Sequence, residues 1–227
     1  PFSIFHFPFS SPIVPELPEV ETTRRGIEPH VLGRVVRELR VRERRLRWPV
    51  PESVAAGLAG LPIERVQRRA KYLLMHNARG AALIHLGMSG SLRVLDAATA
   101  LRAHDHYDVL LDDDHLLRFN DPRRFGSLLW QASGEVHPLL ASLGPEPFDP
   151  GFDGGYLHAR AHGRSAPVKH FLMDQNIVVG VGNIYAAEAL FRAGIDPRRA
   201  AGRVSLARFE ALAQAVKAIL GHAIERG

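Results

Sequence analysis

The residues best placed to do chemistry form the stretch Pro15–Gly26, PELPEVETTRRG. A proline at a chain terminus carries a secondary amine, which acts as a nucleophile when it is unprotonated near neutral pH. Glu16 follows directly and could donate a proton, and Glu19 lies one helical turn further on, where it could orient or tune that acid. In the printed sequence Val14 precedes Pro15, so this nitrogen is an amide whose lone pair is delocalised until the preceding residues are removed.

Lys71 lies in a second block, Gln67–Leu73 (QRRAKYL), which is rich in cationic side chains. Cationic groups so close together could form an edge that binds phosphates. The alternative is a solvated strand edge that its charge protects from pairing with other chains. The block alone leaves both interpretations open.

Two turns bounded by glycines carry large apolar side chains. The segment His85–Gly90 contains Met88, and the segment Asn120–Gly126 contains Phe125 beside Arg123. Taken singly, the apolar residues would be assigned to a core, but loop tips between glycines seldom bury large side chains. The flanking glycines therefore weaken the core assignment but leave it open.

A further block, Asp174–Ala186 (DQNIVVGVGNIYA), predicts two helices around a turn that contains Gly180 and Gly182. Glycine lets the backbone approach a ligand closely, and the turn leads into a helix N-terminus whose free N–H groups favour a phosphate. Asn183 could add a side-chain amide. The alternative is an ordinary helical hairpin, because short glycine patterns are weak signals.

The pattern of elements predicts an α+β protein with two domains. We expect a helix over 17–28 that Gly26 and Pro29 limit, a helix over 52–59, and short strands between 34 and 131 that form a sandwich or flattened barrel. Helical spacing prevails after 153, and the last helix, over 206–225 with Ser205 as its cap, should bury Leu206, Phe209, Leu212, Val216, Ile219 and Leu220.

The predicted division has four parts. They are an extension over 1–14 that is non-native or disordered, an N-terminal β-sandwich domain with flanking helices over 15–143, a proline-rich linker over 144–152, and a C-terminal helical domain over 153–227.

The charge balance points to a polyanionic partner. The chain has 227 residues, a formal net charge of +5 and a pI of about 10.1. Ten Lys/Arg and six Asp/Glu lie from Gly151 onward, against 19 and 18 before it, so the excess falls in the predicted helical domain. The chain has no cysteine, which excludes disulfides and fits a reducing cytoplasm. No apolar run reaches the length of a membrane span, so we expect no membrane partner.

Taken together, PELPEVE, QRRAKYL, NDPRRFG and DQNIVVGVGNIYA resemble the formamidopyrimidine-DNA glycosylase family, and the resemblance covers nearly everything from Pro15 to Gly227. Leu17 and the QRRAKYL block favour this branch over endonuclease VIII. The resemblance implies that the helical domain contains a helix-two-turn-helix motif.

The family also implies roles for individual residues. Pro15 would be the nucleophile, Glu16 the acid and Glu19 its neighbour, while Lys71 would contact the phosphate beside the lesion and assist elimination. Residues that would enter the double helix and fill the gap left by the extruded nucleotide are Met88, Arg123 and Phe125. Residues that would bind DNA are His104, Arg123, Arg164, Lys169, Asn183 and Tyr185.

The activity implied by the resemblance is removal of 8-oxoguanine and formamidopyrimidines from duplex DNA, followed by β,δ-elimination at the abasic site through a proline Schiff base. The partner is damaged double-stranded DNA, bound by a monomer in the bacterial cytoplasm. Family members carry a structural zinc in a C-terminal four-cysteine finger, and we expect no cofactor in this chain, which has no such finger. The alternative is a catalytically inactive protein that binds damaged DNA or abasic sites, because Pro15 is not N-terminal and the finger is missing.

Two histidine and aspartate runs, His104–His106 and Asp112–His115, have side chains that can bind metals, which would suit a metal-dependent hydrolase. The first lies where the family has a DNA-contacting histidine, and the second is typical of a hairpin turn. We therefore predict no metal site.

Overall fold

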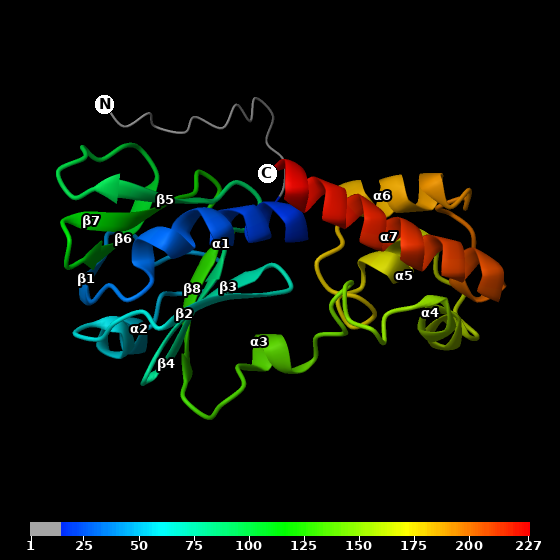
Figure 1. The fold of residues 1–227 in the computed structure, drawn as a ribbon, viewed down its shortest axis with the longest axis horizontal. Coiled ribbons are helices and arrows are strands. Elements are labelled where there is room, and N and C mark those ends of the chain that lie inside the picture. The colour runs from blue at the N-terminus through cyan, green and yellow to red at the C-terminus, as the bar shows by residue number, and fades with distance from the viewer. Residues whose placement is uncertain (1–14) are drawn as a thin grey trace.

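The computed structural model describes residues 15–227, which form a sheet-rich N-terminal part and a helical C-terminal part (Figure 1). The predicted extension over 1–14 lies outside the described residues. The two parts confirm the predicted α+β class, with a β-sandwich followed by a helical region.

The N-terminal part contains two four-stranded antiparallel sheets, with strand orders β1-β6-β7-β5 and β2-β3-β4-β8. Their strands are β1 (Val36–Val41), β2 (Arg65–Arg69), β3 (Tyr72–Asn77), β4 (Gly80–His85), β5 (Ser91–Asp96), β6 (Asp105–Leu111), β7 (His115–Asn120) and β8 (Ser127–Ala132). The turn between β4 and β5 contains Met88, which is half-buried, and the turn between β7 and β8 contains Phe125, which is exposed.

The sheets enclose one apolar core. Leu73 and Met75 of β3 are buried in it, whereas Leu74 points to the opposite face of the sheet and packs with Leu140 in a smaller cluster. This alternation is the two-residue period of a strand. Because β3 is covered on both faces, it gives rigid support to Lys71, which lies in the turn just before it.

Helix α1 (Leu17–Val31) connects the two parts, since it packs against β2, β5 and α7 (Figure 1). The predicted end at Glu28 was wrong, because the helix continues past Pro29 to Val31. Ile27 and Val31 are buried in the sandwich core, and this packing outweighs the hydrogen bond that a proline cannot donate. The first turn of α1 thus lies at the boundary between sandwich and helices.

Helix α2 (Glu52–Leu58) closes one side of the sandwich, where Gly57 lies against the ring of Trp130. The remaining helices are α3 (Pro138–Ala141), α4 (Gly154–Ala161), α5 (Val168–Met173), α6 (Asn183–Arg192), the 3₁₀ helix η1 (Ala201–Arg203) and α7 (Leu206–Arg226).

A second apolar core holds the C-terminal helices together. The predicted face of α7 is buried there at Phe209, Leu212, Val216 and Leu220, with Ile219 packed at its edge. Leu206 is exposed, contrary to the prediction, because it is the first residue of α7 and lies outside the packed turns. Ser205 is the N-cap, although its side chain makes no capping hydrogen bond. Within residues 15–227 no helix is long and apolar enough to cross a membrane.

Residues 144–152, predicted as a linker, form neither helix nor strand but are bound at several points. The Gly144 N–H donates to the Gln175 carbonyl, and the Pro145 carbonyl accepts from the Val179 N–H. The Glu146 carboxylate accepts from the Ala70 N–H at 2.8 Å. These bonds attach the segment both to the β2–β3 turn and to the loop before α6.

Candidate active site

Glu16 is the centre of the first group of predicted site residues. It is 1% exposed, and its carboxylate is held at the N-terminus of α6. The carboxylate accepts hydrogen bonds from the N–H groups of Gly182 at 2.6 Å and Ile184 at 2.9 Å. The α6 N-terminus was predicted to bind a phosphate, but the anion that it binds here is this carboxylate.

Glycine is required at two positions of this contact. A Cβ on Gly182 would lie 2.4 Å from Cδ of Glu16, and a Cβ on Gly180 would lie 2.5 Å from Cδ1 of Leu17. The Leu17 N–H also donates to the Gly180 carbonyl at 3.0 Å. The two glycines therefore allow the loop before α6 to lie directly against the first turn of α1.

Glu19, Tyr185 and Lys71 complete the group. The Tyr185 hydroxyl donates to Oε1 of Glu19 at 2.6 Å, and Oε2 of Glu19 accepts from the Glu16 N–H at 2.8 Å. Lys71 lies in the β2–β3 turn, close enough to Glu16 and Glu19 for both carboxylates to stabilise its charge. Four predicted residues from three separate segments thus lie around Pro15 in one cluster.

Burial sets the protonation of this cluster. It raises the pKa of Glu16, although the helix N–H groups and Lys71 oppose the shift. Burial also lowers the pKa of Lys71, against the pull of the two carboxylates. The pKa of Tyr185 is raised by burial and by its bond to Glu19, which keeps the hydroxyl a donor. The raised pKa of Glu16 favours the protonated form of its carboxyl group, which is the form that a general acid needs.

The second group lies along a cleft of about 960 Å³, whose wall includes Lys71, Met88, Arg123 and Phe125. Phe125 is 42% exposed, and the guanidinium of Arg123 lies over its ring at 4.8 Å. Lys71 is the residue that belongs both to the cluster around Pro15 and to this cleft. The cleft therefore extends from Lys71, which lies close to Glu16 and Glu19, to the half-buried Met88 and the exposed Phe125.

We call Gly87–Gly90 the Met88 loop and Pro122–Gly126 the Phe125 loop. They touch through their backbones, because a Cβ on Gly87 would lie 2.4 Å from the Gly126 nitrogen. Gly87 has φ of +70°, a conformation that glycine adopts without strain. The two loops thus form one wall of the cleft.

Sequence reasoning missed two residues of this region, Asp121 and His85. Asp121 is fully buried behind both loops and accepts from the Ser89 hydroxyl and the Gly126 N–H. His85 lines the cleft, and burial together with Lys71 and Arg47 lowers its pKa to about 4, so Nδ1 accepts from the Gly87 N–H at 2.9 Å. The Asn-Asp-Pro string was a signal for an Asp-centred turn.

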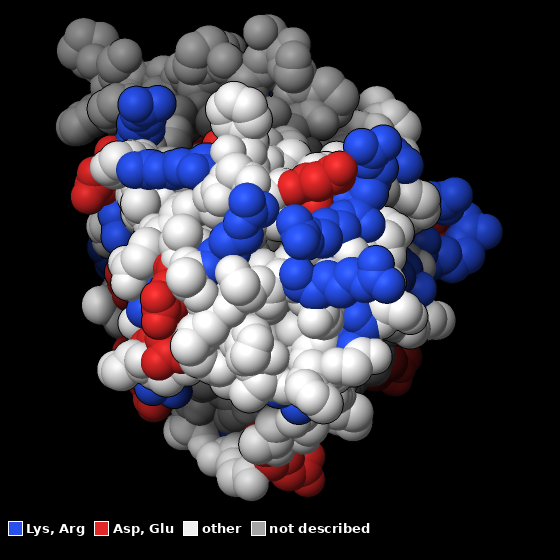
Figure 2. All heavy atoms as spheres, turned by 90° about the vertical axis from the view of Figure 1, so that its right-hand side faces the viewer, with Lys and Arg blue, Asp and Glu red and all other residues white. Residues whose placement is uncertain are grey.

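The remaining predicted residues are not in the cleft. His104 is exposed in the turn before β6, and Asn183 is exposed at the start of α6. Arg164 is exposed, with its guanidinium 5.5 Å from the Phe171 ring, and Lys169 is half-buried on α5. Figure 2, which faces the helical end of the molecule, shows Lys and Arg gathered mainly on one side, with few acidic side chains between them.

The phosphate-binding interpretation of QRRAKYL is corrected for two of its residues. Arg68 forms ion pairs with Glu21 at 3.3 Å and Glu146 at 2.8 Å, and Arg69 pairs with Glu146 at 3.0 Å. These arginines fasten the 144–152 segment to the sandwich. Lys71 is the cation of this block that faces the cleft.

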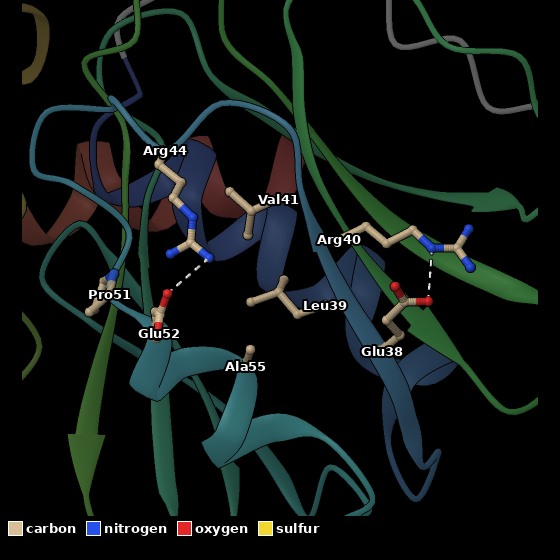
Figure 3. Close-up of a pocket in the computed structure, with 8 residues that line it drawn as sticks. All are labelled: Glu38, Leu39, Arg40, Val41, Arg44, Pro51, Glu52 and Ala55. Atoms are coloured by element: carbon tan, nitrogen blue, oxygen red, sulfur yellow. Dashed lines mark hydrogen bonds and ion pairs between the residues drawn. The ribbon is translucent and has the colours of Figure 1, made fainter.

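A smaller cavity of about 350 Å³ lies between β1 and α2, and none of the predicted site residues lines it (Figure 3). Its charged side chains are paired with each other, Arg40 with Glu38 at 2.8 Å and Arg44 with Glu52 at 3.8 Å. Within residues 15–227, no group of three or more His, Cys, Asp or Glu could hold a metal ion. In the predicted His104–His106 run, Asp105 instead accepts from Asn120 and His106 contacts the Asp121 carbonyl.

Comparison with known proteins matches two family models to this chain. Residues 14–128 match the formamidopyrimidine-DNA glycosylase N-terminal domain, and residues 143–227 match the formamidopyrimidine-DNA glycosylase H2TH (helix-two-turn-helix) domain. A formamidopyrimidine-DNA glycosylase of Stenotrophomonas maltophilia (strain R551-3) is 66% identical over 214 residues, which are 94% of this chain and 79% of the relative. One of Xanthomonas euvesicatoria pv. vesicatoria (strain 85-10) is 61% identical over 215 residues, with the same coverage.

Solved structures show the same likeness. The formamidopyrimidine-DNA glycosylase of Lactococcus lactis, non-covalently bound to DNA containing an AP site, superposes with a TM-score of 0.86 at 29% identity, over 92% of this chain and 82% of that one. The MutM (Fpg) protein of Thermus thermophilus gives a TM-score of 0.83 at 37% identity, over 93% and 76% of the two chains.

Proposed function

Because this chain belongs to the formamidopyrimidine-DNA glycosylase family, we propose that it excises oxidised purines, namely 8-oxoguanine and formamidopyrimidines, from duplex DNA and then cleaves the strand at the abasic site. The observation that carries the proposal is the buried Glu16 carboxyl directly after Pro15, held by the N-terminus of α6 beside Lys71. The DNA in the matched Lactococcus lactis structure, which contains an AP site, supports the substrate class.

The nucleophile is the secondary amine of Pro15 once that residue is the first of its chain. Its nitrogen attacks C1′ of the damaged nucleotide, the bond from C1′ to the base breaks, and the base leaves with the proton that the Pro15 nitrogen loses. The ring oxygen O4′ then accepts a proton from Glu16 as the sugar opens to an iminium ion. Burial supports this role, because it raises the pKa of Glu16 and so favours the protonated acid.

Strand cleavage follows from the same intermediate. The iminium makes the C2′ proton acidic, so its removal expels the 3′ phosphate by β-elimination, and a second elimination releases the 5′ phosphate. Burial lowers the pKa of Lys71, whereas the nearby Glu16 and Glu19 carboxylates favour its charged ammonium form. We assign Lys71 to the phosphate beside the lesion, where it stabilises the departing negative charge.

The cleft supplies the second requirement, extrusion of the nucleotide from the stack. Unstacking a base costs a few kcal/mol, which apolar side chains inserted into the gap offset. The exposed Phe125 and the half-buried Met88 are apolar residues on adjoining loops at the cleft, and Arg123 is a bidentate donor for the unpaired partner base. A cleft of about 960 Å³ lies within the size range of nucleotide-sized sites.

The resemblance also implies a four-cysteine zinc site, which these residues do not form. The chain has no cysteine, and its described histidines and carboxylates make no group of metal ligands.

Borohydride trapping tests the proposal. A protein beginning at Pro15 is incubated with 8-oxoguanine duplex or abasic duplex and sodium borohydride, and the adduct is mapped by peptide mass. The printed chain, in which Val14 blocks the nitrogen, is the matched control, and a form extended with the part of the Stenotrophomonas maltophilia relative that this chain does not cover is run in parallel. We expect a covalent adduct at Pro15 and none with the blocked control.

A Glu16→Gln variant separates the steps, since glutamine retains the shape but has no proton to give. We expect its excision rate to fall by roughly 10²-fold or more. DNA binding without an adduct in both unblocked forms would reject the proposed catalysis, and an adduct at a lysine alone would reject Pro15 as the nucleophile.

A further inference from the structure

We propose that Asp121 is a positioning residue whose buried carboxylate joins the Met88 loop and the Phe125 loop into a single unit that enters DNA together. Asp121 is 0% exposed and touches neither the cleft nor the residues around Pro15. The inference rests on the proposed function, because it concerns how the inserted side chains are held.

The hydrogen bonds of the carboxylate reach both loops. Oδ1 accepts from the Ser89 hydroxyl at 2.5 Å and from the Arg123 N–H at 3.2 Å, and Oδ2 accepts from the Gly126 N–H at 2.8 Å. The Ser89 oxygen also accepts from the Arg123 N–H at 3.3 Å, so the two loops are bonded to each other directly as well as through Asp121. Three donors converge on one carboxylate, and among residues 15–227 none of its partners is a cationic side chain.

The backbone of Asp121 secures two further residues that lie in strained conformations. Its N–H donates to the carbonyl of His104, and its carbonyl accepts from the N–H of Arg124. His104 and Arg124 have φ of 71° and 55°, values that residues other than glycine adopt only where their surroundings hold them. The carbonyl of Asp121 also contacts Nε2 of the buried His106 at 2.7 Å. Asp121 thus connects three segments that carry predicted DNA-contacting residues.

This geometry explains how exposed side chains hold a defined position. Arg123 and Phe125 are exposed and Met88 is half-buried, so the direction of these side chains depends largely on the loops that carry them. Loops tied to one buried group move together, whereas independent loops would lose conformational entropy separately on inserting into DNA. We therefore expect Asp121 to determine how completely the gap is filled rather than how tightly phosphates are bound.

The test uses the 227-residue chain and a duplex with a tetrahydrofuran abasic analogue opposite 2-aminopurine, which requires no catalysis. Binding is measured by anisotropy, and gap filling by the 2-aminopurine fluorescence change at saturating protein. Asp121→Asn keeps the size of the side chain but replaces one carboxylate oxygen with an NH₂ group. That group is a donor, and it would face the donors that the oxygen now accepts from. We expect its fluorescence change at saturation to fall to a small fraction of that of the unmodified chain, with a Kd raised less than about tenfold.

Asp108→Asn is the matched control, because Asp108 on β6 is also a buried carboxylate, but it bonds to Arg42 and Arg118 rather than to the loops. We expect this variant to melt earlier and keep its full fluorescence change. Ser89→Ala removes one of the three donors, and this variant should stay folded but lose part of the fluorescence change. If Asp121→Asn does not fold, the Ser89→Ala result tests the inference in its place. In a foldable Asp121→Asn background, Ser89→Ala should add little.

Full fluorescence change in Asp121→Asn, or in Ser89→Ala where the former is unfolded, would overturn the inference. Failure of the unmodified chain to bind the duplex would instead reject the proposed DNA binding, and the inference with it. Loss of catalysis at Pro15 alone would leave these readouts unaffected.

Discussion

Replacing Gly182 by alanine should displace the Glu16 carboxylate from the N-terminus of α6 without disturbing the backbone. Gly182 has φ of −119°, which any residue can adopt, so the substitution introduces no backbone strain. The new Cβ would lie 2.4 Å from Cδ and 2.6 Å from Oε1 of Glu16. Because no real Cβ comes so close, the flexible side chain must move and give up its hydrogen bonds.

The cost follows from the bonds that are lost. The bonds from Gly182 at 2.6 Å and Ile184 at 2.9 Å both involve a carboxylate, and such bonds contribute about 1.5 kcal/mol or more each. We expect the free energy of unfolding to fall by about 3 kcal/mol, which for a chain of this size lowers Tm by roughly 6–12 °C. Losing the positioned acid should also slow excision by roughly 10²–10⁴-fold.

Gly26→Ala is the control, since Gly26 lies in α1 and a Cβ added there would have no atom of another segment within 4 Å. That substitution should stabilise the helix by roughly 0.5–1 kcal/mol and leave excision unchanged. The assays are thermal melting and single-turnover excision on 8-oxoguanine duplex with proteins that begin at Pro15. If Gly182→Ala melts and reacts like Gly26→Ala, the assignment of Glu16 to this helix terminus is wrong.

Three further predictions test other parts of the molecule. His85 has a pKa of about 4 in the folded chain and 6.5 in the unfolded chain, so the unfolded chain binds the proton more strongly. The stability that is present above pH 6.5 should therefore be lost as the pH falls toward 4, by about 2 kcal/mol between pH 7 and pH 5. Urea unfolding at the two pH values should show a smaller loss for His85→Gln. Gly57→Ala would place a Cβ 2.3 Å from the Trp130 ring and should cost about 1–3 kcal/mol in the same assay, a result that an unchanged midpoint would contradict. Phe125→Ala should change the free energy of unfolding by no more than about 0.5 kcal/mol, because the ring is 42% exposed, yet it should slow excision by about tenfold or more. Equal excision rates would show that Phe125 does not fill the gap in the DNA.

Local patterns were sufficient for most of the fold. Short β-rich runs predicted the sandwich, and helical spacing predicted the helical region after 153 with its long last helix, α7, because each pattern reports which face a short segment buries. The end of α1 was missed at Pro29, where packing of Ile27 and Val31 against the core overrides a local signal. Leu206 was assigned to a buried face that its position at the helix start does not reach.

For the candidate site, the sequence predicted residue types but not which residues pair with each other. Glycine in the turn before α6 indicated a close approach of backbone to an anion, but the sequence could not identify that anion as Glu16, which lies 166 residues away. Arg68 and Arg69 looked like phosphate ligands until their pairing with Glu146 was visible. Asp121 was overlooked because a buried acid is recognisable only once its donors are in place.

The sequence by itself determined the family, the two-part architecture and the residue types of the site, because motif order and hydrophobic period are local properties of the chain. Only the tertiary structure decided which side chains are buried and which charged groups lie beside each other. These two properties raise the pKa of Glu16 and lower the pKa of Lys71. Burial and electrostatic pairing depend on distances between segments far apart in the chain, and those distances exist only after the sandwich and the helices have packed around α1.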